Sequence, residues 1–203
     1  MKRSGILLAV VGILVLSTSI AAAQPKHSIG VKGGVNFADL YGDDAEGTKS
    51  ATGFAAGAAG MFQLHPNFGI GVEVLYTRKG AKDEATDETL KLDYIEIPVL
   101  ATGIYPVDEK VSLMGYVGPA VAFNIKADDE GEDIKDFITS TDFSAAFGAG
   151  AIFAAGPVDI TVEGRYTLGF MSIDDTATDA DLKNTVISGL VGIMFPLGAG
   201  AAE

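Results

Sequence analysis

The stretch VDITVEGRYTLGF, from Val158 to Phe170, alternates between two kinds of side chain at every step. Valine, isoleucine, glycine, tyrosine, leucine and phenylalanine occupy the even positions, whereas the odd positions carry aspartate, threonine, glutamate, arginine and glycine. Successive side chains of a β-strand point to opposite faces, so this period of two predicts a strand with one apolar and one polar face. The stretch SIGVKGGVNFA, from Ser28 to Ala38, has the same pattern.

The alternation recurs along the chain and predicts eight strands, at residues 28–38, 52–64, 68–79, 90–105, 111–125, 142–154, 158–170 and 185–197. The connections between these strands alternate between long and short along the chain, and the long ones are 40–51, 80–89, 126–141 and 171–184. A meander with its long connections at one end and its tight turns at the other is the layout of an outer-membrane barrel. The expected fold class is therefore all-β: an eight-stranded antiparallel up-and-down transmembrane β-barrel.

The composition narrows the function classes. The 203 residues include 27 acidic and 14 basic side chains and no cysteine. An acidic surface repels a phosphate backbone, so no nucleic acid is expected as a partner. Without cysteine there is no thiol catalysis, disulfide framework or cysteine-based metal site. Most acidic residues fall in or beside the long connections, and the strands are nearly free of charge, which favours a barrel in a membrane.

Residues 1–23 are expected to be a cleaved signal peptide. Lys2 and Arg3 form a charged start, followed by an apolar run over residues 6–16 and small residues before Gln24. The run is shorter than the roughly 20 residues that a spanning helix needs. Residues 24–203 then form the barrel domain, exported to the cell outer membrane with both termini in the periplasm and the long connections outside.

A soluble ligand-binding barrel is the alternative fold, because its strands alternate equally well with the apolar set turned inward. Aromatic residues near both ends of the predicted strands favour the membrane, since aromatic girdles form at the two interfaces of a bilayer. They are Phe37, Tyr76, Tyr94, Phe123 and Phe170 at the loop end, and Phe62, Phe68, Tyr105, Phe153 and Phe195 at the turn end.

Six stretches carry a family resemblance: GVKGGVNF (30–37), VEVLYTRKG (72–80), YIEIPVL (94–100), VGP (117–119), EGRYTLG (163–169) and GIMFPL (192–197). In this order and spacing they resemble the PorT-like small outer-membrane β-barrel proteins of Bacteroidetes-type bacteria. The resemblance implies an outer-membrane barrel but no particular activity, because such proteins are mostly of unassigned function. The tail after Phe195 departs from the usual barrel-assembly signal, which commonly ends on an aromatic residue.

The polar faces place five charged residues inside the expected barrel. They are Lys32, Glu73, Glu96, Glu163 and Arg165. Each lies near the middle of its strand, so they are expected to meet in one buried cluster, because charges persist in a low-dielectric interior only when paired. The interpretations are a structural ion network, a proton or ion relay, and a catalytic pair of carboxylates. Glu73 and Glu96 lie on neighbouring strands, so one of them holds a proton if Arg165 does not reach both.

Neither enzymatic activity nor a cofactor is expected. The two histidines, His27 and His65, both lie at the turn end of the predicted barrel, and the chain has no G-x-S-x-G motif for a serine nucleophile. An eight-stranded barrel is just wide enough for side chains to fill it, so no open pore is expected either.

A run of acidic residues is a weak candidate for a calcium site, since hard cations bind clustered carboxylates, but the run lacks EF-hand spacing. It consists of Asp128, Asp129, Glu130, Glu132 and Asp133. Divalent cations bridging the acidic loops to lipopolysaccharide are a second interpretation, with Arg78 and Lys79 at the same rim binding phosphate directly. A saline habitat, where net charge keeps a surface soluble, is a third.

The expected role is structural or interactive: an outer-membrane barrel that exposes acidic extracellular loops. Its expected partners are outer-membrane lipid, lipopolysaccharide and an unidentified protein. The alternative is a narrow transport or ligand-binding barrel for a small polar solute, recognised by the interior charges.

Overall fold

The computed structural model describes residues 27–42, 48–83, 89–129, 132–135, 138–173 and 182–197. The strands are β1 His27–Tyr41, β2 Thr48–His65, β3 Phe68–Asp83, β4 Thr89–Pro106, β5 Val111–Asp129, β6 Glu132–Asp133, β7 Thr141–Ala155, β8 Val158–Gly169 and β9 Lys183–Leu197. The signal peptide predicted over residues 1–23 lies outside the described residues. Among the described residues, no helix is long and apolar enough to cross a membrane.

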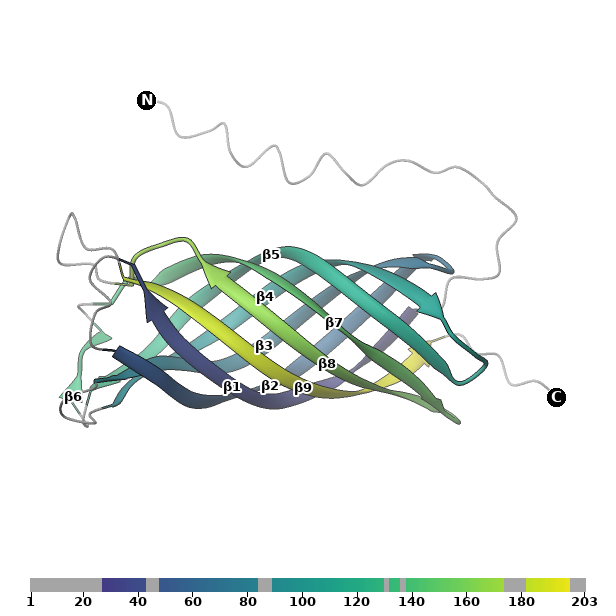
Figure 1. Cartoon of the computed structure of the whole chain (residues 1–203), viewed down its shortest axis with the longest axis horizontal. Helices are drawn as coiled ribbons and strands as arrows, with labels where there is room; N and C mark the ends of the chain where they lie inside the picture. Colours follow the sequence, from purple (N-terminus) through teal and green to yellow (C-terminus); the bar gives the residue numbers. More distant parts are fainter. Residues whose placement is uncertain are drawn as a thin grey trace, which may run out of the picture.

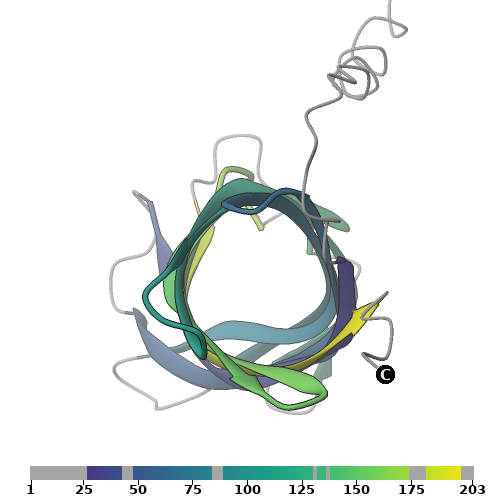
Figure 2. The same cartoon turned by 90° about the vertical axis from the view of Figure 1, so that its right-hand side faces the viewer.

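The eight long strands close into one antiparallel barrel. Each long strand pairs with its neighbour in the order β4-β3-β2-β1-β9-β8-β7-β5, and pairing of β4 with β5 completes the ring. The view along the axis shows this closed ring, and the side view shows the tilted strands around it (Figures 1 and 2). His27 pairs with Leu197, so the first and last described strands lie side by side at the turn end. The predicted fold class is therefore confirmed.

The strands run further toward the loop end than predicted. β3 continues to Asp83 and β5 continues to Asp129, where the two-residue β6 pairs with it. Residues there do not alternate between apolar and polar, yet their backbones continue the ladder, as in the pairing of Lys82 with Thr89. Several acidic residues predicted to lie in connections, including Asp83 and Asp128, are therefore strand residues.

The apolar faces point outward. Val31, Phe147 and Val191 are 58%, 47% and 51% exposed, whereas Asn36 and Thr102 on the inward phase are each 1% exposed. A soluble barrel would have the reverse arrangement, because apolar surface of this extent is stable only against another apolar medium. The outer face of this barrel therefore suits the hydrocarbon of a bilayer.

The prediction that Tyr94 belongs to the aromatic girdle is wrong. Tyr94 is completely buried and points into the barrel, because it shares the inward phase of β4 with Glu96 and Pro98. Its ring lies under the ammonium group of Lys79, with Nζ 5.1 Å from the ring centroid. Eight of the other predicted girdle residues are among the exposed large side chains: Phe37, Phe62, Phe68, Tyr105, Phe123, Phe153, Phe170 and Phe195.

Candidate functional site

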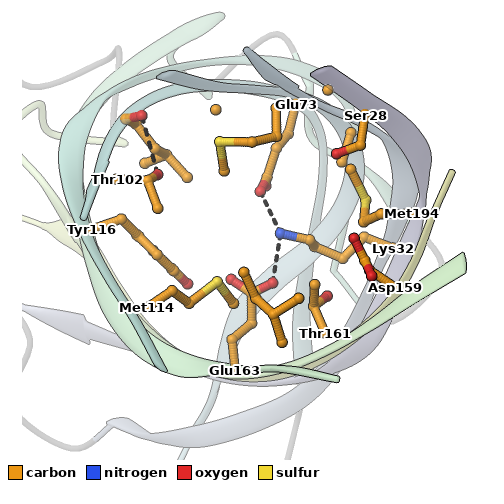
Figure 3. Close-up of a pocket in the computed structure, with 16 residues that line it drawn as sticks. Ser28, Lys32, Glu73, Thr102, Met114, Tyr116, Asp159, Thr161, Glu163 and Met194 are labelled. Atoms are coloured by element: carbon orange, nitrogen blue, oxygen red, sulfur yellow. Dashed lines mark hydrogen bonds and ion pairs between the residues drawn. The ribbon is translucent and has the colours of Figure 1, made fainter. Parts of the chain in front are cut away.

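Four charged side chains form a cluster across the middle of the barrel: Lys32 of β1, Glu73 of β3, and Glu163 and Arg165 of β8. The guanidinium of Arg165 binds Glu73 through two contacts, with Nη1 2.8 Å from Oε2 and Nη2 2.9 Å from Oε1. The ammonium group of Lys32 lies 2.6 Å from Glu73 and 2.5 Å from Glu163 (Figure 3). We call these four residues the mid-barrel cluster.

The mid-barrel cluster is electrically balanced, with two cations and two carboxylates. Its side chains are 1–9% exposed, so each charge has lost nearly all of its water. Isolated buried charges are costly, and they persist when paired and hydrogen-bonded. Arg165 also donates a hydrogen bond from Nε to the hydroxyl of Tyr116, at 3.2 Å. The forked Arg165–Glu73 contact specifies the relative orientation of the two side-chain groups and links β3 to β8 across the lumen.

A second cluster lies nearer the loop end and consists of Lys79 of β3, Glu96 of β4 and Asp142 of β7. Lys79 Nζ is 2.7 Å from Glu96 Oε2 and 3.9 Å from Asp142 Oδ2. All three residues are at least nine-tenths buried. Asn184 of β9 donates a hydrogen bond to Asp142, at 3.3 Å. We call Lys79, Glu96 and Asp142 the loop-end cluster; it joins three strands around one ammonium group.

The loop-end mouth of the barrel is filled by apolar side chains. Leu92, Tyr94, Ala122 and Ala127 point in from β4 and β5, and Ile138 and Ile173 reach them from connecting segments. The two segments are tied by a backbone hydrogen bond from Thr139 N to Ile173 O, at 2.8 Å. We call these six apolar residues the apolar cap. Below it, apolar and charged side chains leave a cavity of only about 10 Å³.

The turn-end half of the barrel contains a larger cavity, of about 60 Å³. Lys32, Glu73 and Glu163 line it, together with Met114 and Met194 (Figure 3). A third methionine, Met61, also belongs to its wall. A cavity needs about 10–15 Å³ to hold one water molecule, so this one has room for about four to six. The interior is thus asymmetric, with its space at the turn end and its packed apolar side chains at the loop end.

The single charge cluster expected from the sequence is instead two clusters. The structure brings together Lys32, Glu73, Glu163 and Arg165, but it places Glu96 with Lys79, which the sequence interpretation had put on the rim. Glu73 and Glu96 therefore do not share one site: Glu73 is bound by Arg165 and Lys32, and Glu96 is bound by Lys79. Strand phase could have identified Lys79, since residues 73, 75, 77 and 79 share one face of β3.

Lys79 is therefore not available to bind phosphate, because its side chain is 1% exposed. Arg78, its neighbour, points outward and binds Asp93 with Nε 2.7 Å from Oδ1. His27 packs near Phe62, with ring centroids 6.0 Å apart, and His65 accepts a hydrogen bond from Asn67 N. Both histidines lie at the turn end, remote in register from the two clusters.

The structure describes the proposed calcium residues only in part. Asp128 lies 3.2 Å from Lys126 Nζ, which is an ion pair rather than a carboxylate cluster. Glu130 and the side chains of Asp129, Glu132 and Asp133 lie outside the described residues. Within the described part of the chain, no group of three or more acidic or histidine side chains is arranged to hold a metal.

Comparisons with known proteins agree with this architecture. Residues 8–195 match the family described as outer membrane protein beta-barrel domain. Neisserial surface protein A is 21% identical with a TM-score of 0.52, over 82% of this chain and 97% of that one. OprG from Pseudomonas aeruginosa is 12% identical with a TM-score of 0.51, over 89% of this chain and all of that one.

Ail of Yersinia pestis, solved with the heparin analogue sucrose octasulfate, is 20% identical with a TM-score of 0.45, over 84% of this chain and 99% of that one. No curated protein matches the sequence.

Proposed function

Because this chain belongs to the outer membrane protein β-barrel domain family, we propose that it is a sealed, non-enzymatic barrel of the outer membrane, with a structural or interactive role. In this proposal the N-terminal signal peptide is cleaved, the four long connections face outward with their acidic residues, and no continuous aqueous path crosses the barrel. Within the family we place it with the PorT-like members, on the six stretches that resemble them.

The observation that carries this proposal is the filling of the barrel interior. The mid-barrel cluster spans the lumen from β1 and β3 to β8, and the apolar cap closes the loop-end mouth. Hydrated ions need a continuous polar path, whereas the cap offers apolar surface and the clusters offer charges already paired with one another. This interior supports a barrel whose cross-links hold its shape.

We expect the protein to fractionate with the outer membrane and to migrate faster on gels before boiling than after it. Liposomes containing the folded protein should swell no faster in small sugars and amino acids than empty liposomes. Swelling at the rate produced by a general porin, with migration confirming the folded state, would contradict a sealed barrel. Recovery in the soluble periplasmic fraction would contradict the membrane location.

Glu96→Gln distinguishes a structural interior from a transport pathway. The variant keeps the shape of the side chain but leaves Lys79 with only the distant carboxylate of Asp142. Loss of a hydrogen bond to a charged group costs about 1–3 kcal/mol, so the midpoint of urea unfolding should fall. Liposome permeability should stay unchanged. Altered permeability with unaltered stability would assign Glu96 to a pathway instead.

A second candidate function is binding of a small polar solute in the turn-end cavity. The cavity itself favours it, and so does the hydroxyl of Thr161 in its wall, which has no hydrogen-bond partner among the described residues. Ethanolamine, which carries a hydroxyl and an ammonium group, is a suitable probe. If the cavity binds it, the methyl NMR signals of Met61, Met114 and Met194 should shift with saturation. Unchanged methyl signals would contradict binding in this cavity and would leave the sealed barrel as the proposed function.

A further inference from the structure

A group of cations lies on the outer face of β3, β4 and β5, immediately beyond the apolar surface. On these strands Tyr76, Ile95 and Ile125 are the last large apolar or aromatic side chains on the outer face. Arg78 and Asp93 follow them, and register pairs Arg78 with Asp93 and Asp93 with Lys126. A row of charges therefore begins where the apolar face ends, at the depth of lipid head groups.

The row continues upward as a patch with a positive excess. Lys91 pairs in register with Gly80, and Lys82 pairs with Thr89, so both lie further toward the loop end. We call Arg78, Lys82, Lys91 and Lys126 the basic strip. All four are exposed or half-buried. A positive strip is unexpected on a chain whose net charge is −13, and this contrast sets it apart from the rest of the surface.

The charges of the strip are only partly balanced by neighbours. Arg78 binds Asp93, and Lys126 binds Asp128 at 3.2 Å. Lys82 and Lys91 make no ion pair with any described residue, although Lys91 pairs in register with Asp128, the partner of Lys126. Arg78 also lies over the ring of Phe54, 5.6 Å from its centroid, and Phe54 stacks on Tyr76. An aromatic platform below and unbalanced cations above match an amphipathic ligand whose apolar part lies in the bilayer and whose anionic part lies at its surface.

We propose that the basic strip binds the phosphate groups of an outer-leaflet glycolipid of the lipid A type. Adjacent strands are about 4.8 Å apart, so Arg78 and Lys126, separated by one strand, stand about 10 Å from each other. This width lets separate cations engage two phosphates of one disaccharide head group. Arg78 makes its forked contact with Asp93 through Nε and Nη2, which leaves Nη1 for a phosphate oxygen, and the lysine ammonium groups supply compact charges. The inference rests on the proposed function, because it needs the loop end to face the outer leaflet.

The test compares two double variants that remove the same charge. Lys82→Gln with Lys91→Gln removes the unbalanced part of the strip. Lys110→Gln with Lys135→Gln is the control, since Lys110 lies in the turn after β4, at the opposite end, and Lys135 lies outside the strip. Each protein is placed in phosphatidylethanolamine nanodiscs containing either bisphosphorylated lipid A or phosphatidylglycerol. Native mass spectrometry then counts the anionic lipids that each barrel retains after extraction into detergent.

We expect wild type and control to retain lipid A in preference to phosphatidylglycerol, and the strip variant to bind lipid A about tenfold more weakly. Added salt should weaken binding less steeply in the strip variant than in wild type, because fewer charges are engaged. Equal lipid A binding by the strip variant and wild type would overturn the proposal. So would an equal loss in the control, or retention of phosphatidylglycerol as tight as that of lipid A.

Failure of this inference is separable from failure of the proposed function. The substituted lysines point away from the barrel interior, so both double variants should keep the migration shift on boiling. A barrel that inserts, shifts on boiling and binds both lipids equally contradicts only the lipid A site. A wild-type protein that stays soluble contradicts the membrane barrel itself.

Discussion

Arg165→Met should destabilise the folded barrel by about 3–5 kcal/mol, because it removes one partner from a buried charge network. Glu73 would lose both of its guanidinium contacts and Glu163 would lose its contact at 3.5 Å. Lys32 alone would then face two buried carboxylates. Urea unfolding of the protein in detergent micelles, followed by migration on unboiled gels, measures the loss.

A double-mutant cycle separates pairing from packing in this prediction. Combining Arg165→Met with Glu73→Gln removes both members of the forked pair, so the double variant should be more stable than the sum of the single losses implies. Recovery of about half of the loss or more indicates that the uncompensated carboxylate caused it. Additive losses would mean that Arg165 stabilises the barrel through packing on Tyr116 and not through charge. The guanidinium carbon of Arg165 lies 5.2 Å from the centroid of the Tyr116 ring.

Gly118→Ala is the second change with a large expected effect. A Cβ at position 118 would lie 1.9 Å from the backbone oxygen of Val99 on β4, and 2.8 Å from its carbonyl carbon. Backbone atoms of a closed barrel have little freedom to move, so the strands must separate at this point. We expect a loss of at least about 3 kcal/mol, at the upper end for overpacking, and a smaller fraction of protein that folds.

Gly115→Ala on the same strand is the matched control. A Cβ there would meet its nearest atom, the backbone oxygen of Gly148, at 3.9 Å, which is ordinary contact. Its stability should therefore stay within about 0.5 kcal/mol of wild type. If the two alanine variants unfold at the same urea concentration, the close approach of β4 to β5 at Gly118 is not a constraint on the barrel.

The sequence was sufficient for the barrel but not for its loop-end interior. Strict alternation, as in Val158 to Phe170, assigned the faces, and the regular change between long and short connections assigned the topology. Lys79 was misplaced because it lies close to a predicted connection, although its phase on β3 points inward. Strand extension past residue 79 carries no periodic signal, because ladder hydrogen bonds form between backbones whatever the side chains are.

The apolar cap could not be predicted for a different reason. Ile138 and Ile173 belong to segments with no alternation, so their contact with Leu92 and Tyr94 depends on how two connections fold back together. Asp142 could not be predicted either. It lies at the start of β7, and its charged partner, Lys79, lies on β3, far away in the sequence. The alternation of apolar and polar residues identifies the two faces of a single strand, whereas these contacts depend on which side chains meet across the lumen.

Single-channel recording of the folded protein in planar bilayers tests the sealed interior most directly. With the mid-barrel cluster paired and the apolar cap in place, we predict no discrete conductance steps at membrane potentials at which a porin control conducts ions. The same protein sample must show its shift on boiling, so that silence is not caused by misfolding. Reproducible steps from the folded barrel would contradict the account and would make the interior carboxylates part of an ion pathway.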